Sequence, residues 1–143
     1  MTKTKTPAQI VDAFWTAFTA RRFDELFRDL VAEQCEFVMP GLPRLEGQAP
    51  IRQMFEAYAR AFPDFACRPL HGVESADTYA GEARYTGTHR APLATAQGEL
   101  PPTGRAVSWD SADIIRVADG KIVSWHVYHD PIALLAQLGV AVG

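Results

Sequence analysis

The sequence predicts an α+β fold, and three observations lead to this class. Before residue 63, apolar side chains mostly recur at helical spacing. After it, alternating polar and apolar residues predict a run of strands, and an apolar helical segment follows the last of them. Helices that precede a run of strands are typical of α+β folds. The chain has 143 residues, a length that suits a single core, so we expect one domain over residues 1–143.

Three helices and a short strand are expected first. A proline suits the first turn of a helix over residues 7–21. Asp24 is expected to cap a shorter second helix. Residues 35–39 read as a strand, and a third helix over residues 51–62 ends before a Pro-Asp pair. The apolar stripes of these helices would supply one side of the core.

Four longer strands and a final helix are expected next. The strands are predicted at about 66–75, 79–90, 105–117 and 121–130. A tight turn at Asp119-Gly120 joins the last two strands. The stretch 91–104 holds three of the ten prolines and is expected to be a long loop. An apolar helix begins at Pro131.

Composition argues against several classes of partner. The net charge is −3 and no cluster of Lys or Arg occurs, so we expect neither nucleic-acid nor membrane binding. No stretch approaches the roughly 20 apolar residues of a membrane span. The first residues form no apolar run, so we expect no signal peptide and a cytoplasmic location. Cys35 and Cys67 are far apart and are expected to be free thiols.

Several segments, in this order, carry a family resemblance over residues 8–140. They are Phe62-Pro63-Asp64-Phe65, Gly87-Thr88-His89, Pro101-Pro102-Thr103-Gly104-Arg105, Asp119-Gly120-Lys121-Ile122, and Asp130 seven residues before Gln137-Leu138-Gly139. Together they resemble the SnoaL-like polyketide cyclases of the nuclear transport factor 2-like superfamily. The resemblance implies a cone-shaped α+β barrel, in which a strongly curved antiparallel sheet wraps around the N-terminal helices. It also implies a homodimer and a cofactor-free intramolecular aldol ring closure of a polyketide ester.

Two positions depart from the family pattern. His126 stands where a tryptophan is expected, and Trp125 lies one place earlier. Arg90 follows the Gly-Thr-His segment, where a small or polar residue is expected. Both changes fall where the resemblance implies a pocket, so they bear on the substrate and on the reaction.

Asp130 matches the position of the general acid/base in the cyclases. A carboxylate walled by aromatic side chains is desolvated, so its pKa rises from about 3.9 and it becomes a stronger base for a C–H proton. The alternative is that Asp130 only caps the helix beginning at Pro131, because Asp is favoured at that position.

Strand alternation divides the last strand into two faces. Ile122, Ser124, His126, Tyr128 and Asp130 share one face; Val123, Trp125, Val127 and His129 share the other. We assign the first set to the cavity because it contains Asp130. The second set would then form an outer apolar patch, which predicts a homodimer through that face.

Further catalytic candidates follow from this choice of face. His126 lies four residues from Asp130, about 13 Å along a strand, and is a candidate for contacting a substrate carbonyl. Pairing about the turn would set Asp110 near Tyr128, and Ser108 near Asp130, so Asp110 is a candidate second acid. Asp113 would then face the other side, unless the register slips by one residue.

The expected ligand is an apolar or aromatic small molecule. Aromatic and imidazole side chains at predicted inward positions are the candidate contacts: Trp15, Phe37, Phe55, Tyr58, Tyr85, His89, Trp109 and Tyr128.

No metal or other cofactor is expected. The sequence lacks the spacing of a metal site, a nucleotide loop or a serine-hydrolase elbow. Two alternatives to a cyclase stay open. One is a binding module without chemistry; the other is a hydroxylase or an epoxide hydrolase on the same fold, for which Asp110, Asp113 and Arg116 are a loose match.

Overall fold

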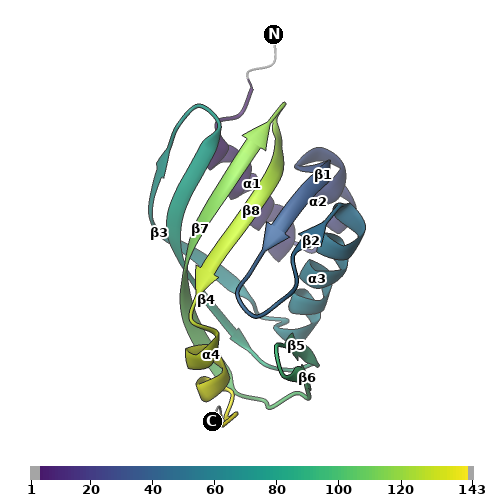
Figure 1. The fold of residues 1–143 in the computed structure, drawn as a ribbon, viewed down its shortest axis with the longest axis vertical. Helices are drawn as coiled ribbons and strands as arrows, with labels where there is room; N and C mark the ends of the chain where they lie inside the picture. Colours follow the sequence, from purple (N-terminus) through teal and green to yellow (C-terminus); the bar gives the residue numbers. More distant parts are fainter. Residues whose placement is uncertain (1–3, 142–143) are drawn as a thin grey trace.

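The computed structural model describes residues 4–141 and has the expected α+β architecture (Figure 1). The helices are α1 (Pro7–Thr19), α2 (Phe23–Asp29), α3 (Gln48–Ala61) and α4 (Pro131–Gln137). The strands are β1 (Val31–Val38), β2 (Leu45–Glu46), β3 (Ala66–Glu74), β4 (Thr78–Thr88), β5 (Leu93–Thr95), β6 (Gly98–Leu100), β7 (Ala106–Ala118) and β8 (Lys121–His129).

One curved sheet organises the molecule. Its strand order is β2-β1-β8-β7-β4-β3, and the sheet is open between β2 and β3. The helices α1, α2 and α3 lie on one side of it, while α4 and the β5–β6 hairpin gather at one end (Figure 1). The predicted cone is confirmed. The sheet is nevertheless not wholly antiparallel, because β1 pairs with β8 in parallel.

The first helix anchors the core. Thr6 and Gln9 form a capping box at its start, with side chains and backbone N–H groups bonded reciprocally. Phe14 is fully buried, and its ring centroid lies 4.8 Å from that of Trp125 and 5.1 Å from that of Phe55. Phe14 therefore joins α1 to β8 and α3 through edge-to-face contacts.

Two local predictions are wrong. Arg22, not Asp24, occupies the cap position of α2, and no side chain caps that helix. Asp24 lies in the first turn and instead accepts a hydrogen bond from Arg52 at 2.6 Å. The stretch 91–104 is also not a plain loop, because it contains the β5–β6 hairpin.

A β-bulge in β8 decides which side chains face the core. The turn at Asp119-Gly120 forms as predicted, with φ of 53° and 76°. The pairing then shifts, because Val117 pairs with Ile122 whereas Arg116 pairs with Ser124. Val123 is the extra residue, and an extra residue reverses the alternation beyond it.

The predicted assignment of faces on β8 is therefore wrong. Trp125 and Val127 are buried in the core, whereas Tyr128 is 52% exposed. The predicted register is wrong as well, since Tyr128 pairs with Ala112 rather than with Asp110. In the second half of β8, the side chains that were predicted to face the cavity point outward, and those that were predicted to point outward face the core.

The structure also bears on the cysteines, on membrane-spanning helices and on metal-binding groups. Cys35 and Cys67 are both free, as predicted. Within residues 4–141, no helix is long and apolar enough to cross a membrane. The same residues contain no group of three or more His, Cys, Asp or Glu side chains placed to hold a metal ion.

Candidate active site

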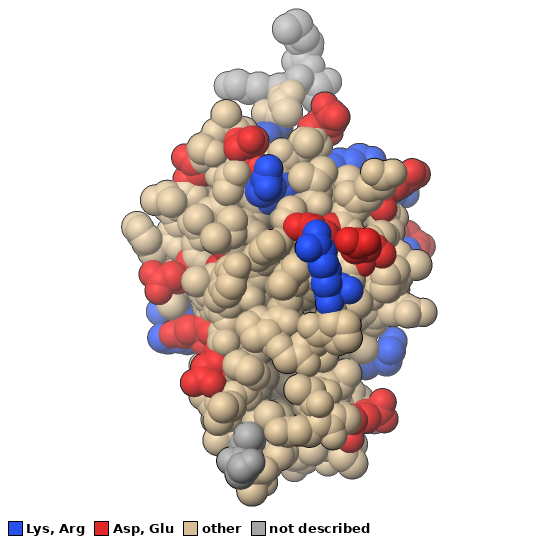
Figure 2. Space-filling model, in the orientation of Figure 1, with Lys and Arg blue, Asp and Glu red and all other residues tan. Residues whose placement is uncertain are grey.

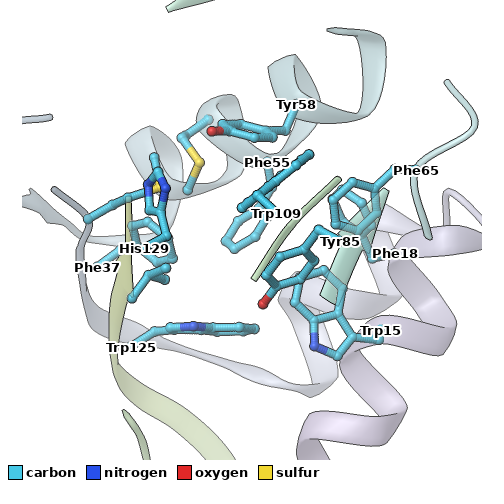
Figure 3. Close-up of a pocket in the computed structure, with 13 residues that line it drawn as sticks. Trp15, Phe18, Phe37, Phe55, Tyr58, Phe65, Tyr85, Trp109, Trp125 and His129 are labelled. Carbon is cyan, nitrogen blue, oxygen red and sulfur yellow. The ribbon is translucent and has the colours of Figure 1, made fainter. Parts of the chain in front are cut away.

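An aromatic cavity lies between the helices and the inner face of the sheet (Figure 3). Six of the predicted ligand contacts line it: Trp15, Phe37, Phe55, Tyr58, Tyr85 and Trp109. The sequence reasoning missed seven further lining residues: Phe18, Met39, Met54, Phe65, Trp125, Val127 and His129. The free volume is about 50 Å³. That is well below the roughly 300 Å³ or more of a site for a drug-sized ligand.

The wall of the cavity is a continuous set of aromatic contacts. The Tyr85 ring centroid lies 5.5 Å from those of Trp15 and Trp109. Trp15 is also 5.5 Å from Trp125. All three tryptophans of the chain therefore line the cavity. Aromatic rings in offset and edge contacts make a rigid wall, while Met39 and Met54 are the flexible side chains that could yield to a ligand.

A second space, the outer chamber, adjoins the aromatic cavity. It has a free volume of about 230 Å³ and lies among residues 40–42, the β5–β6 hairpin and α4. Met39, Tyr58 and His129 line both spaces. Among the residues that the structure describes, no Asp, Glu, Lys or Arg side chain lines either space. A ligand that passes from the outer chamber to the aromatic cavity would pass these three side chains.

His129, the last residue of β8, carries the basic group of this passage. Its Nδ1 is buried and has no hydrogen-bond partner among the described residues. Burial lowers the pKa of His129, and the negative charge of Asp130 opposes that effect. The imidazole is therefore neutral at neutral pH. Burial raises the pKa of Tyr58 to about 12, so this phenol keeps its proton. The passage thus holds a neutral imidazole, which can accept a proton at one ring nitrogen, and a phenol that can donate a hydrogen bond.

Asp130 lies outside the aromatic cavity. The residue is exposed, and its Oδ1 accepts hydrogen bonds from the backbone N–H groups of Ile132 at 3.0 Å and Ala133 at 3.1 Å. These bonds make Asp130 the N-cap of α4. Its expected place among aromatic walls is wrong, and the alternative that it caps the helix is confirmed. Whether it also takes part in catalysis stays a prediction.

Three other predicted residues lie on the outer face of the sheet. His126 bonds Glu36 at 2.8 Å, and Tyr128 is exposed. Asp110 accepts two hydrogen bonds from Arg84, at 2.8 and 3.0 Å, and these hold the pKa of its carboxyl below the usual range. Their expected positions in the cavity are therefore wrong, because all three lie on the face of the sheet that points away from the helices.

Two more expected neighbours differ. Ser108 does not meet Asp130, because its backbone exchanges two hydrogen bonds with the side chain of Gln137 on α4. His89 is fully buried, but it is not among the residues that line the aromatic cavity. Its Nδ1 accepts a hydrogen bond from the Thr103 N–H at 3.1 Å, so His89 connects the end of β4 to the segment between β6 and β7.

Asp113 is a buried carboxylate that the predicted choice of cavity face left outside. It is 4% exposed, and the Tyr85 hydroxyl donates a hydrogen bond to its Oδ2 at 2.7 Å. Burial raises the pKa of Asp113 to about 6, although the bond from Tyr85 opposes this. The predicted strand pairing already put Asp113 on the same side of the sheet as Trp125 and Val127, so no slip of the register was needed. The error was to take that side as the outer one.

The comparisons with known proteins settle the family. A family model described as SnoaL-like polyketide cyclase matches residues 8–138. The chain belongs to this family. The resemblance inferred from the sequence is therefore confirmed, whereas a search of the curated proteins finds no match.

Three solved structures share the fold of this chain. IdmH from Streptomyces antibioticus, a candidate polyketide cyclase, is 26% identical over 95% of this chain and 100% of its own, with a TM-score of 0.74. A SnoaL-like polyketide cyclase from Agrobacterium tumefaciens is 23% identical over 94% of this chain and 99% of its own, with a TM-score of 0.76. AclR from Streptomyces galilaeus, a candidate hydroxylase, is 20% identical over 93% and 95%, with a TM-score of 0.74.

Proposed function

We propose that this SnoaL-like protein is a cofactor-free enzyme of the cyclase type, in which His129 is the base that removes a C–H proton next to a carbonyl. One observation carries the proposal: a neutral imidazole with an unpartnered Nδ1 lies in a wall that is otherwise almost wholly apolar. A base near neutrality, within reach of an apolar ligand, is suited to general base catalysis.

The proposed substrate is an uncharged, apolar or aromatic polyketide-like molecule. The absence of charged side chains from the lining of both spaces supports this class, because a charged group there would be desolvated without a partner. The description of IdmH as a candidate polyketide cyclase supports it as well. The substrate would fill the outer chamber and displace Met39 and Met54 to enter the aromatic cavity.

In the proposed ring closure, the proton that His129 removes from a carbon atom is later returned to an oxygen atom. His129 accepts the proton, and the electron pair of the C–H bond forms an enolate. The enolate carbon attacks a second carbonyl carbon of the same molecule, so that a C–C bond forms and that carbonyl oxygen becomes an alkoxide. The alkoxide takes the proton back from the His129 imidazolium. Tyr58, which lines the same passage, would donate a hydrogen bond to the developing negative oxygen.

Asp130 is proposed to act through its neighbour. Its negative charge raises the pKa of His129 against the effect of burial, which keeps the imidazole a stronger base. The carboxylate can do this while it caps α4. In this proposal Asp130 is a positioning residue. The alternative is that its carboxylate removes the proton directly, and Asp130→Asn distinguishes the two.

The test is α-proton exchange of a model carbon acid. 2-Tetralone in D₂O is incubated with the protein, and loss of the α-proton signal is followed by ¹H NMR. His129→Asn is expected to lower the catalysed rate by about 10²–10⁴. His126→Asn removes an imidazole from the outer face of the same strand and should leave the rate unchanged. Full activity in His129→Asn would overturn the proposal.

A binding module without chemistry is the second candidate. The nearly complete apolar lining favours it, because such walls give affinity without any reacting group. The same experiment separates the two: ligand binding with no exchange above the buffer rate is expected of a binding module alone.

A homodimer through the outer face of the sheet is a further part of the proposal. The dimer was predicted from an outer apolar patch that included Trp125 and Val127, but both residues are buried in the core. The outer face still exposes Ile114 and Tyr128, and much of the middle of this face is free of charged groups (Figure 2). Sedimentation at micromolar concentration should show a dimer, and a monomer would contradict it. A cytoplasmic location also stays a prediction.

A further inference from the structure

The proposed mechanism leaves one buried polar pair of the cavity unused. Tyr85 lines the aromatic cavity, and its hydroxyl points toward the space between Trp125 and Trp15, across the cavity from His129 in Figure 3. The same hydroxyl donates its proton to Asp113, at 2.7 Å. A phenol has only one proton, so the Tyr85 oxygen has only lone pairs left to offer to the cavity.

The surroundings of Asp113 keep this arrangement in place. Besides Tyr85, the groups that face it are Tyr79 of β4, Cys67 of β3 and Ser111 of its own strand, and none of these is a cation. Val127 of β8 and Gly81 of β4 lie directly across in the sheet and carry no polar side-chain group.

The α1 side adds no cation to this region. Trp15 lines the aromatic cavity, and Asp12, which is exposed, lines an outer groove together with Cys67 and Tyr79. Within residues 4–141, Asp113 therefore has no positive partner; the Tyr85 hydroxyl bonds its Oδ2, and its Oδ1 is buried without a hydrogen bond.

We propose that Tyr85 and Asp113 form a subsite for a hydroxyl group of the ligand, an enol or a phenol, which donates its proton to the Tyr85 oxygen. The subsite rests on the aromatic cavity as the binding site of the proposed function, and it names a polar group that the substrate carries. A carbonyl or ether oxygen in the same place would meet the lone pairs of Tyr85 and is disfavoured.

The protonation of Asp113 gives the subsite a pH dependence. At neutral pH the carboxylate is mostly ionised, because its pKa is raised only to about 6. Below that pH the carboxyl holds a proton and can donate it to the Tyr85 oxygen, which frees the phenol proton to turn toward the cavity. The preference for a ligand hydroxyl over a methoxy group should then fall.

Phenol and anisole are the matched probes. They differ by replacement of the hydroxyl proton with a methyl group, and each is a single ring. Binding to the full chain is measured by calorimetry at pH 7.5 and pH 5, with tryptophan fluorescence as a second readout. At pH 7.5 the wild type should bind phenol roughly three- to tenfold more tightly than anisole, the range expected of one net hydrogen bond. At pH 5 the two affinities should approach each other.

Two single-atom variants locate the preference. Tyr85→Phe should bring the phenol-to-anisole ratio close to one. Tyr128→Phe removes a hydroxyl from the exposed outer face of the sheet and should keep the ratio. Circular dichroism checks that both variants are folded, and the pH comparison of the wild type needs no substitution. Equal binding of the probes at pH 7.5, or a preference that is kept in Tyr85→Phe, would overturn the subsite.

This experiment is independent of turnover. If His129→Asn retains full exchange activity while the phenol preference follows Tyr85, the catalytic proposal fails and the subsite stands. If the probes bind equally well while exchange depends on His129, only the subsite fails. If neither probe binds, the subsite is overturned, and the exchange assay with His129→Asn alone decides the catalytic proposal.

Discussion

The two faces of the sheet differ in chemistry although they are formed by the same strands. The inner face carries aromatic rings, a buried carboxylate and a neutral imidazole. The outer face carries exposed ion pairs, such as Arg84 with Asp110, and scattered apolar side chains (Figure 2). Neighbouring residues of one strand point to opposite faces, and in β8 His129 lines the cavity whereas His126 lies on the outer face.

The largest difference between the faces is expected in stability. Phe14→Ala removes a fully buried ring that contacts the inner face, and should lower the free energy of unfolding by about 3–5 kcal/mol. Ile114→Ala on the outer face, where the side chain is 43% exposed, should cost less than about 1 kcal/mol. Urea denaturation measures both, and equal losses would contradict the assignment of faces.

Asp113 and Asp110, on the same strand, should give pH effects of opposite sign. The pKa of Asp113 is raised to about 6, so its contribution to stability is complete below the unfolded value and is lost as pH rises through 6. The loss amounts to about 2–3 kcal/mol between pH 4 and pH 7. Asp113→Asn should abolish that slope in denaturation measured across this range.

The control is Asp110→Asn on the outer face. Arg84 lowers the pKa of Asp110, so its small contribution is present above the unfolded value and is lost as pH falls. Its removal should therefore lower the free energy of unfolding slightly at neutral pH. A profile unchanged in Asp113→Asn would contradict the burial of a titrating carboxyl there.

The smallest effect is expected at Asp130. Asn retains the ability to cap α4, so stability should change little. Loss of the charge lets the pKa of His129 fall further, which should lower tetralone exchange by about three- to tenfold and move its acidic limb to lower pH. A loss of about 10² or more would instead identify Asp130 as the direct base.

Most of the fold could be predicted from the sequence because its signals are local. Helical spacing, prolines at helix starts and the Asp119-Gly120 turn each act within a few residues, and the four long strands formed near their predicted bounds. The parallel pairing of β1 with β8 could not be foreseen, because it joins distant segments and depends on how the sheet curves.

The candidate site was predicted in part. Trp15 and Phe55 were placed correctly, because helical spacing identifies their inward faces. The polar residues were not, because the cavity face was chosen to contain Asp130, and that carboxylate caps α4 outside the cavity. In a regular strand, two side chains that face the same side are an even number of residues apart. Ile122 and Trp125 are both bulky and apolar, and both are buried, yet they are three residues apart. This odd spacing was a local sign of the bulge.

The most direct test of the central claim follows the imidazoles of the two β8 histidines by NMR, with and without 2-tetralone. His126→Asn assigns the signals. Ligand should shift the His129 resonances and leave those of His126 unchanged, and His129 should titrate below 6.5, the ordinary pKa of a histidine, because burial lowers its pKa. Ligand-induced shifts at His126 but not at His129 would contradict the account, because they would place the ligand on the outer face of the sheet.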